Sequence, residues 1–303
     1  MKKRARTKKQ PRAKMGGGLY IVATPIGNAD DITLRALATL EQADLIACED
    51  TRVTGKLLAF HGIAAAKTPY HEHNAARALP VLLRHLERGQ AVALVSDAGT
   101  PLISDPGYKL VNACHDAGIP VTVIPGATAP IAALAASGLP SDRFLFAGFL
   151  PAKQVARRKT LKELSSVKAT LVFFESPRRL AASLGDMATV LGHRKAAIAR
   201  ELTKFFEEVR RATLEELARH YREAGPPKGE VVIVVAAAEK SAAPALADVA
   251  DIDAQLSAAL ESLGVRDAAA KVAAATGVSK RELYSRALAL TGRGGRSGGR
   301  KSR

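Results

Sequence analysis

The stretch Leu19-Tyr20-Ile21-Val22-Ala23-Thr24 decides the fold class, because it is the first of four short apolar runs that alternate with helical patterns. A continuous apolar run of this length is typical of a parallel strand buried on both faces. The other runs lie at 44–48, 91–96 and 121–124, and the helical patterns at 33–42, 74–88 and 108–117. Asp31 or Thr33 would cap the first helix. The alternation predicts an α/β domain with a parallel sheet that helices cover on both faces.

The spacing of the apolar runs changes after Gly138-Leu139-Pro140. Five further strands are expected at 143–150, 170–174, 196–199, 208–212 and 230–236. Two of them lie close together and carry alternating charge, which favours antiparallel pairing. The chain is therefore expected to hold two α/β domains, at 18–138 and 139–240, the second with a mixed sheet.

The last folded part is expected to be a small helical module. It spans 250–290, with helices at 252–263, 266–275 and 279–290, after an Ala/Pro-rich linker at 241–247. The small-residue helix, glycine turn and serine cap at 268–279 are typical of a helix-turn-helix. That motif would place Lys280, Arg281 and Tyr284 on an exposed face. An ordinary three-helix cap is the alternative interpretation, and the residues alone leave both open.

The formal net charge of +16 is concentrated at the two ends of the chain. Residues 1–14 hold eight lysines and arginines without an acid, residues 291–303 hold five, and the span 15–290 is nearly neutral. Tails of this composition, at 1–17 and 291–303, are expected to be disordered and would follow the phosphates of a nucleic acid. A solvated tail that only aids solubility is the alternative, and a start at Met15 would remove the first tail.

The composition excludes several classes of protein. With 303 residues, 47% of them hydrophobic, the chain is long enough for two compact domains and too apolar for general disorder. Aromatic residues make up only 4%, without tryptophan, which argues against a nucleic-acid-binding sheet rich in stacking side chains. Cys48 and Cys114 cannot form a disulfide framework, no apolar segment of a signal peptide follows the basic N-terminus, and prolines interrupt the longest uncharged stretch. A cytoplasmic protein without a membrane segment is expected.

Four loops dense in glycine, proline and aspartate follow the predicted parallel strands, at 24–28, 49–52, 96–107 and 125–128. Because the carboxyl ends of parallel strands lie at one edge of a sheet, these loops are expected to form the ligand site. Neither a G-x-x-x-x-G-K-[ST] loop nor a G-x-G-x-x-G turn follows the first strand, and Pro25 removes an amide donor. A cation-bearing cofactor of the size of adenosine therefore suits the loops better than a triphosphate. His71 and His73 form an H-x-H pair without a third ligand nearby, which favours a polar loop over a metal site.

Six motifs occur in a fixed order: Thr24-Pro25-Ile26-Gly27-Asn28, Glu49-Asp50-Thr51-Arg52, Ser96-Asp97-Ala98-Gly99-Thr100-Pro101 with Asp105-Pro106-Gly107, Pro125-Gly126-Ala127, Phe174-Glu175-Ser176-Pro177-Arg178-Arg179 and Arg200-Glu201-Leu202-Thr203-Lys204. In this combination they resemble the ribosomal RNA small subunit methyltransferase I family of the tetrapyrrole-methylase-like superfamily. The resemblance covers about residues 18–290, and its specificity rests on the ordered combination rather than on any single motif.

The resemblance implies an S-adenosylmethionine-dependent enzyme that methylates the ribose 2′-oxygen of a cytidine in the decoding region of small-subunit (16S) rRNA. It also implies a homodimer, a cofactor held in the cleft between the two α/β domains, and a helical module that contacts RNA. The residues that would line the cofactor are Pro25, Asp97, Gly99, Leu102, Ile103, Ala127, Thr128, Phe174, Glu175, Ser176 and Gly229.

Methyl transfer to a ribose hydroxyl requires that the hydroxyl lose its proton, which a carboxylate or a neutral lysine can accept. Asp50, Glu201 and Lys204 are the candidates, with Arg52 holding the adjacent phosphate. The reaction needs no metal and no covalent enzyme intermediate. The residues expected to contact RNA are the basic cluster Lys153, Arg157, Arg158 and Lys159, for which a solvated helix face is the alternative, and Lys280, Arg281 and Tyr284.

Two other functions remain as alternatives. A methyltransferase of the same fold that acts on a tetrapyrrole or another small molecule would have no evident use for the helical module and the basic tails. A DNA-binding regulator would leave the loop motifs unexplained. The sequence also leaves open whether free rRNA or the assembled 30S subunit is the substrate.

Overall fold

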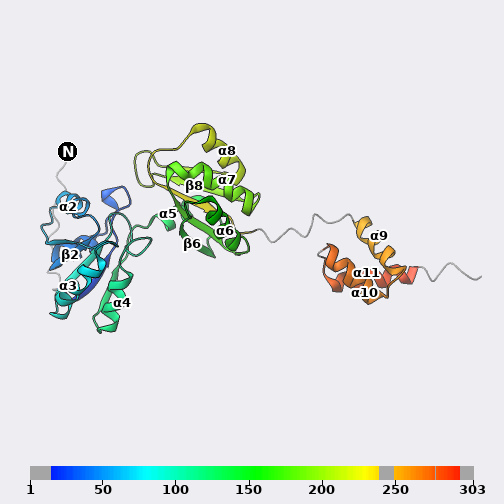
Figure 1. Cartoon of the computed structure of the whole chain (residues 1–303), viewed down its shortest axis with the longest axis horizontal. Coiled ribbons are helices and arrows are strands. Elements are labelled where there is room, and N and C mark those ends of the chain that lie inside the picture. The colour runs from blue at the N-terminus through cyan, green and yellow to red at the C-terminus, as the bar shows by residue number, and fades with distance from the viewer. Residues whose placement is uncertain (1–14, 239–248, 277, 294–303) are drawn as a thin grey trace, which may run out of the picture. The chain divides into compact units, whose positions relative to one another are not determined.

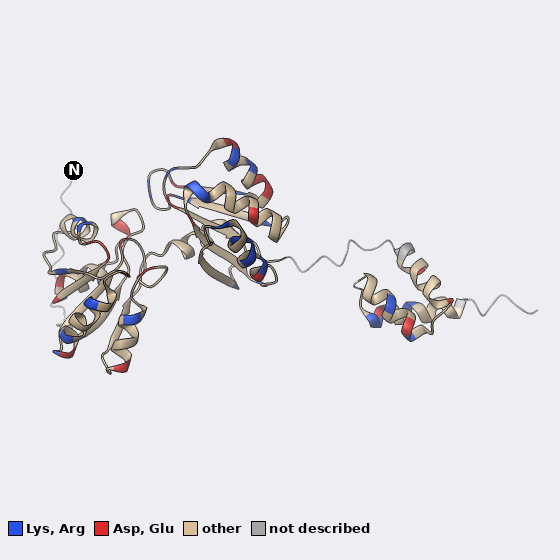
Figure 2. Ribbon diagram, in the orientation of Figure 1, with Lys and Arg blue, Asp and Glu red and all other residues tan. Residues whose placement is uncertain are grey.

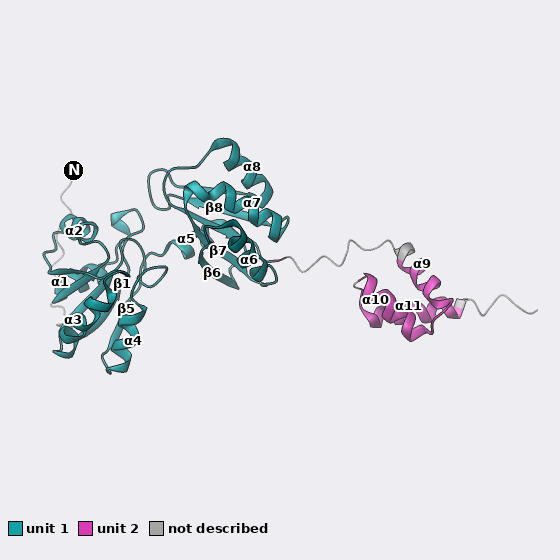
Figure 3. Cartoon of the chain, in the orientation of Figure 1, with its two compact units in different colours: residues 1–237 teal, residues 238–303 magenta. Residues whose placement is uncertain are grey.

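The computed structural model describes residues 15–238, 249–276 and 278–293. The chain forms two compact units, residues 1–237 and residues 238–303, which we describe separately (Figure 3). The first unit holds two sheets with their helices, and the second holds helices (Figure 1). The expected linker at 241–247 and most of both basic tails lie outside the described residues.

A parallel sheet forms the first half of unit 1, as the alternation of apolar runs predicts. Its strands are β1 (Gly18–Val22), β2 (Leu45–Cys48), β3 (Lys67–Pro69), β4 (Ala91–Val95) and β5 (Val121–Ile124), in the order β3-β2-β4-β1-β5. All neighbouring strands are parallel. The central strand β4 is buried at every residue, which explains its continuous apolar sequence.

Helices cover both faces of this sheet, which confirms the predicted layers. They are α1 (Leu34–Gln42), α2 (Thr51–Phe60), α3 (Ala75–Glu87) and α4 (Tyr108–Asp116). Successive residues of β4 enter different cores: Leu94 packs with Leu82 of α3, and Val95 packs with Leu40 of α1. The alternating side chains of one strand therefore fill a core on each face.

Two helix starts show how the local sequence sets these elements. The hydroxyl of Thr33 accepts a hydrogen bond from the Ala36 backbone nitrogen (3.0 Å), so Thr33 and not Asp31 caps α1. The helix α2, which the apolar pattern did not predict, begins after Asp50, whose carboxylate accepts a hydrogen bond from the Arg52 backbone nitrogen (2.7 Å). Asp50 therefore has a structural role as a helix cap.

The second half of unit 1 contains the expected mixed sheet. Its strands are β6 (Phe144–Phe149), β7 (Thr170–Glu175), β8 (Lys195–Arg200), β9 (Glu208–Thr213) and β10 (Val231–Val235), in the order β6-β7-β10-β8-β9. β6 and β7 are parallel, and the other neighbours are antiparallel. The pairing of β8 with β9 confirms the hairpin that the alternating charge predicts.

Four longer helices and two short ones complete the described part of unit 1. They are α5 (Ala129–Ser137), α6 (Gln154–Leu164), α7 (Leu180–Leu191), α8 (Leu214–Ala224), η1 (Ala29–Asp31) and η2 (Pro177–Arg179). Leu134 of α5 packs with Val232 on one face of the second sheet, whereas Leu184 of α7 packs with Ile233 on the other. Ile26, from the loop after β1, belongs to the same core as Leu134. A loop of the first sheet is thus part of the core of the second.

Unit 2 is a helical module with a core of its own. Its helices are α9 (Val249–Leu260), α10 (Val265–Thr276) and α11 (Lys280–Arg293). Ile252, Val272 and Leu283, one from each helix, are buried in a single cluster. The Ser279 hydroxyl accepts a hydrogen bond from the Glu282 backbone nitrogen (3.2 Å), as expected of the serine cap.

Charges of both signs are distributed over the helices of unit 1 (Figure 2), which agrees with the near neutrality of 15–290. None of the helices in the described part of the chain is long and apolar enough to cross a membrane. Cys48 and Cys114 are both free thiols and both buried.

Candidate active site

A cavity of about 380 Å³ lies where the loops of the first sheet meet the second sheet of unit 1. The first half contributes Ile26, Ala98, Gly99, Thr100, Ile103, Ser104, Asp105, Thr128 and Ala129, and the second contributes Phe149, Phe174, Glu175, Ser176, Pro177, Ala199, Leu202, Gly229, Glu230, Val231 and Val232. Sites for small molecules have volumes of roughly 300–1,000 Å³. The cavity is therefore the candidate active site.

Hydrogen bonds join the loops of the first sheet into one rim. The Thr24 backbone nitrogen donates to the Gly99 carbonyl (2.9 Å), and the Gly99 nitrogen donates to the Thr24 carbonyl (3.1 Å). The Thr100 hydroxyl donates to the Ala127 carbonyl (3.2 Å). Gly99 has a φ of +85°, a conformation that L side chains rarely adopt. The loops after β1, β4 and β5 are therefore fixed to one another at the cavity.

The loop 201–207 of the second half reaches the loop after β1. The Thr203 hydroxyl accepts a hydrogen bond from the Asn28 backbone nitrogen (3.0 Å). Gly27 lies so close to Lys204 that a Cβ at Gly27 would be 2.5 Å from Lys204 Cγ. The two walls of the cavity are therefore joined directly beside it.

Seven of the eleven predicted cofactor residues line the cavity: Gly99, Ile103, Thr128, Phe174, Glu175, Ser176 and Gly229. The other four do not, for physical reasons. Leu102 packs into the core between the sheet and α3, and Ala127 packs into the core of the second sheet. The Asp97 carboxylate accepts a hydrogen bond from the backbone of the loop after β2 (3.0 Å). Pro25 precedes Ile26, whose side chain occupies the wall instead.

Asp105 is one of the cavity residues that the sequence analysis did not assign to the site. It lies within the quoted loop 96–107, but nothing in the sequence distinguishes it from Asp97. Burial raises the pKa of Asp105 to about 6, the nearby Glu49 carboxylate adds to the increase, and a hydrogen bond from Ser96 opposes it. A carboxylate with a pKa near neutral pH is suited to accept a proton. Among the described residues, no group of three His, Cys, Asp or Glu side chains could hold a metal ion.

Glu175 lines the cavity with a carboxylate that the fold already engages. It accepts hydrogen bonds from the Ser183 hydroxyl and from the Ser176 backbone nitrogen (2.7 Å), and Arg179 forms an ion pair with it (3.2 Å). Arg179 also donates to the Leu150 carbonyl (2.5 Å). Glu175 therefore holds the ends of β6 and β7 at the rim.

Glu201 and Lys204, two predicted proton acceptors, are held in an ion-pair network with Glu230. Lys204 Nζ lies 2.8 Å from Glu201 Oε1 and 3.0 Å from Glu230 Oε2. Burial pulls the pKa of Lys204 down, but the hydrogen bonds to both glutamates outweigh it, so this pKa is raised. The hydrogen bond from Lys204 lowers the pKa of Glu201. A lysine that stays charged and a carboxylate of lowered pKa are weak proton acceptors, so the network favours a structural role for both residues, and their role as bases stays a prediction.

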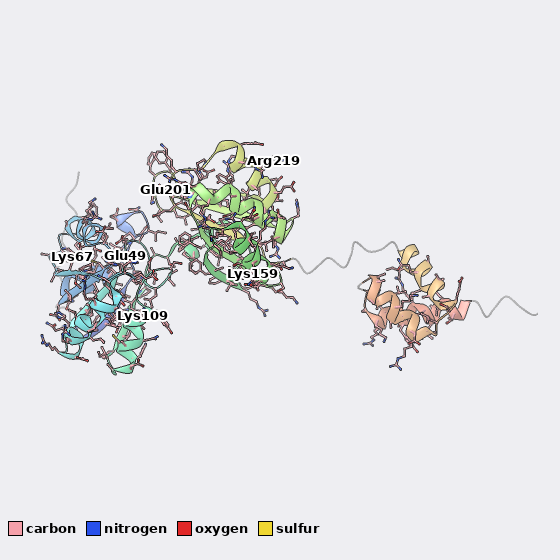
Figure 4. The ribbon with its side chains drawn as sticks, viewed as in Figure 1. Glu49, Lys67, Lys109, Lys159, Glu201 and Arg219 are labelled. Carbon is pink, nitrogen blue, oxygen red and sulfur yellow. The ribbon has the colours of Figure 1, made fainter. Side chains whose placement is uncertain are left out.

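The third predicted proton acceptor, Asp50, does not line the cavity. Its carboxylate forms an ion pair with Arg52 (2.6 Å), whose side chain is 86% exposed. The hydrogen bond from the Arg52 side chain is the main reason why the pKa of Asp50 lies well below its usual range. The role of Asp50 as a base stays a prediction that this geometry does not favour. Figure 4 labels Glu49, the residue before Asp50, in the first half of unit 1, and Glu201 in the second half of unit 1.

The basic cluster at the start of α6 divides into exposed and buried residues. The Arg157 side chain is only 6% exposed, and its guanidinium lies 2.6 Å from the Asp186 carboxylate. Arg158 pairs with the other oxygen of Asp186 (2.6 Å) while remaining half exposed. Arg157 cannot reach an RNA backbone and is corrected to a structural residue. Lys153 and Lys159 are exposed (Figure 4 labels Lys159).

In unit 2 the three predicted RNA residues share the exposed start of α11. Lys280, Arg281 and Tyr284, together with Arg266 of α10, surround a shallow surface depression. Tyr284 is 42% exposed. This is the arrangement that the helix-turn-helix pattern predicts, and whether it contacts RNA remains a prediction.

A side chain at Gly229 should be costly, because a Cβ would be 2.1 Å from the Glu201 carboxyl group, at a φ of +93°. Gly229→Ala is expected to lower the free energy of unfolding by about 2–4 kcal/mol, from backbone strain and displacement of Glu201. Gly225→Ala is the matched control, because Gly225 has a φ of +79° and open space around it. Urea denaturation measures the free energy of unfolding of both variants. Equal losses in the two variants would contradict the close contact between Gly229 and Glu201.

The tetrapyrrole (corrin/porphyrin) methylase family matches residues 18–218 of the chain. The uroporphyrin-III C-methyltransferase from Thermus thermophilus is similar with a TM-score of 0.52 and 25% identity, over 73% of this chain and 94% of that one. The methyltransferase CobJ is similar with a TM-score of 0.55 and 21% identity, over 73% and 95%. Fold and cavity thus define a methyltransferase of the tetrapyrrole methylase class, whose methyl donor is S-adenosylmethionine.

Residues 247–291 match a second family, the C-terminal helix-turn-helix domain of RsmI. A ribosomal RNA small subunit methyltransferase I from Mesorhizobium japonicum is 55% identical over 95% of this chain and 97% of its own length. Another, from Escherichia coli O157:H7, is 48% identical over 91% and 96%. The chain belongs to the ribosomal RNA small subunit methyltransferase I family. Membership favours the helix-turn-helix over an ordinary three-helix cap.

Proposed function

We propose that the protein transfers a methyl group from S-adenosylmethionine to the ribose 2′-oxygen of a cytidine in the decoding region of 16S rRNA. The observation that carries the proposal is the family relationship over nearly the whole chain, both α/β halves and helical module included. The helical module, with its exposed cations, suits an RNA substrate better than a small molecule. The protein would act in the cytoplasm, where ribosomal subunits are found.

The lining of the cavity fits the cofactor. Ile26, Phe174 and Leu202 provide apolar walls for the adenosine group, and Glu230 provides a carboxylate for its cationic groups. When bound, the cofactor supplies an electrophilic methyl group on a positively charged sulfur. The chain's own part is to hold the ribose oxygen in line with that methyl group and to exclude water.

Asp105 is our proposed acceptor of the ribose proton. It lines the cavity, whereas Asp50 does not, and within the described part of the chain no lysine or arginine pairs with it as Lys204 pairs with Glu201. Its carboxylate would take the proton from the 2′-hydroxyl while the oxygen bonds to the methyl carbon, the carbon–sulfur bond breaks and neutral S-adenosylhomocysteine leaves. Glu201 and Lys204 would instead fix the loop 201–207 against the first half.

RNA would be held by exposed cations outside the cavity. Lys153 and Lys159 at the start of α6, and Lys280 and Arg281 on α11, remain proposed contacts to the phosphate backbone. Tyr284 would supply an aromatic face beside them. Arg158 also remains a proposed contact to RNA, but its guanidinium already forms an ion pair with the Asp186 carboxylate.

A homodimer is part of the proposal. β5 and β6 are edge strands of the two sheets, and each leaves apolar side chains exposed: Val123 is 53% exposed, Phe144 43% and Phe149 58%. Ile131 of α5 is 46% exposed. Apolar groups on edge strands are normally covered, and a second copy of the chain would cover these. Sedimentation equilibrium measures the state of association.

The direct test is methyl transfer from labelled S-adenosylmethionine to 30S subunits and to naked 16S rRNA, followed by nucleoside analysis. Label in 2′-O-methylcytidine is the expected result, and the better substrate shows at which stage of assembly the enzyme acts. Label in a methylated base would contradict the 2′-O assignment. No transfer to either RNA, with the cofactor bound, would favour a small-molecule substrate.

A further inference from the structure

The loop 201–207 carries two neighbouring phenylalanines that do not line the cavity. Phe205 is 93% exposed and Phe206 67%, which makes Phe205 the most exposed large apolar side chain among the described residues. Their rings lie 4.9 Å apart, nearly perpendicular. Aromatic residues are scarce in this chain, at 4% of the sequence. Two adjacent rings left in solvent are therefore an unusual feature that needs an explanation.

The fold holds this loop in place beside the cavity. Glu201 and Thr203, with φ angles of 51° and 66°, adopt a left-handed conformation that is rare for residues other than glycine. The Glu230 backbone nitrogen donates to the Glu201 carboxylate (3.0 Å), and the Thr203 nitrogen donates to Glu207 (2.6 Å). Strained residues persist where the surroundings fix them and are concentrated at functional sites. The phenylalanines are thus presented on a fixed support.

The position of the pair relates it to the substrate. Leu202 lines the cavity three residues before Phe205, and Thr203 contacts the loop after β1. A ribose can enter the cavity only if its nucleotide leaves the regular RNA helix, which exposes the faces of its own base and of its neighbours. Exposed bases commonly stack on aromatic side chains.

We propose that Phe205 and Phe206 form a stacking platform for an unstacked RNA base next to the methylated nucleotide. This inference rests on the proposed function, because it takes RNA as the substrate. Stacking requires ring faces and no particular base, so the pair would help to hold the RNA open without selecting its sequence.

A second copy of the chain is the less favoured partner for this pair. Two phenylalanines bury at most about 300–500 Å² between them, whereas a stable protein interface buries about 1,200–2,000 Å². Two of the three carboxylates beside the pair are matched by cations, Glu201 by Lys204 and Glu208 by Arg200 and Arg210. The third, Glu207, accepts a hydrogen bond from the Thr203 backbone nitrogen. The edge strands β5 and β6 are the proposed dimer surface instead.

The test compares three double variants at positions 205 and 206, to Ala, to Leu and to Trp, in the full-length chain. With saturating S-adenosylmethionine, the Ala and Leu variants are expected to lower kcat/KM for the rRNA substrate about 10- to 100-fold, and the Trp variant to stay within about threefold of wild type. Leucine keeps the apolar surface but lacks a ring face, so it separates stacking from a hydrophobic contact. Affinity for S-adenosylhomocysteine, measured by calorimetry, should be unchanged.

Phe60→Ala is the matched control, because Phe60 is 68% exposed and also forms an edge-to-face ring pair, with His61. Its kcat/KM should equal that of wild type. Full activity of the Ala variant, recovery by Leu, or loss of self-association would each overturn the stacking platform. RNA affinity is measured in parallel by fluorescence anisotropy, so the platform is judged even if wild type transfers no methyl group to rRNA, a result that would contradict the proposed function instead.

Discussion

Asp105→Asn is expected to lower the rate of methyl transfer to rRNA about 100-fold or more, within the range of 10²–10⁴ typical of a lost general base. The amide has nearly the shape of the carboxylate but cannot accept the ribose proton. Asp105 lines the cavity and Asp50 does not. Single-turnover assays with enzyme in excess measure the effect on the chemical step.

The same residue predicts the pH dependence. Burial raises the pKa of Asp105 to about 6, so the carboxylate is largely protonated at pH 5 and largely ionised at pH 7. A base acts in its ionised form, so kcat/KM should rise about tenfold for each pH unit below 6 and level off above about 7. In Asp105→Asn this inflection should disappear. An unchanged inflection in the variant would assign the titration to another group.

Asp50→Asn is the matched control for this substitution. Asparagine caps a helix as well as aspartate does, so α2 should keep its start while the ion pair with Arg52 is lost. We expect less than a threefold change in rate, because Asp50 does not line the cavity. A large loss with Asp50→Asn and a small one with Asp105→Asn would return the role of base to Asp50.

The sequence predicts the fold and the location of the site better than it predicts the roles of single residues. Apolar runs such as Ala91–Val95 signal buried parallel strands, and the edge at which such strands end follows from topology. α2 escaped prediction because Gly55 interrupts its pattern and its cap, Asp50, was interpreted as a catalytic residue. Local patterns therefore predict the layers of helices and sheet. The start of α2 depends on Asp50, a residue type that can serve either as a helix cap or as a catalytic group.

The roles of charged residues depend on partners far away in the sequence. The basic neighbours of Arg157 predict an RNA contact, but its guanidinium is buried against Asp186, 29 residues further along. The residue type of Lys204 allows a neutral base, but Glu230, 26 residues away, helps to keep it charged. The pKa of Asp105 depends on burial, which no single residue type reveals. Tertiary contacts, not residue types, decide these roles.

A chain that ends at Ala238 is expected to bind S-adenosylhomocysteine as wild type does but to lose at least 99% of its rRNA methylation. Unit 2 has a separate core, built on residues such as Ile252 and Leu283, so its removal leaves the cores of unit 1 intact. The cavity lies entirely within unit 1. What the truncated chain lacks is the exposed group Lys280, Arg281 and Tyr284.

A smaller change tests the same role without truncation. Lys280→Ala with Arg281→Ala should weaken rRNA binding about tenfold at moderate salt and reduce the slope of log affinity against log salt concentration by about 2, one unit for each lost phosphate contact. Lys271→Ala, at an exposed lysine of α10, is the matched control and should change the affinity less. If the truncated chain still methylates rRNA at the wild-type rate, RNA recognition lies in unit 1, and the cations of α6 and the aromatic pair at positions 205 and 206 would then carry it.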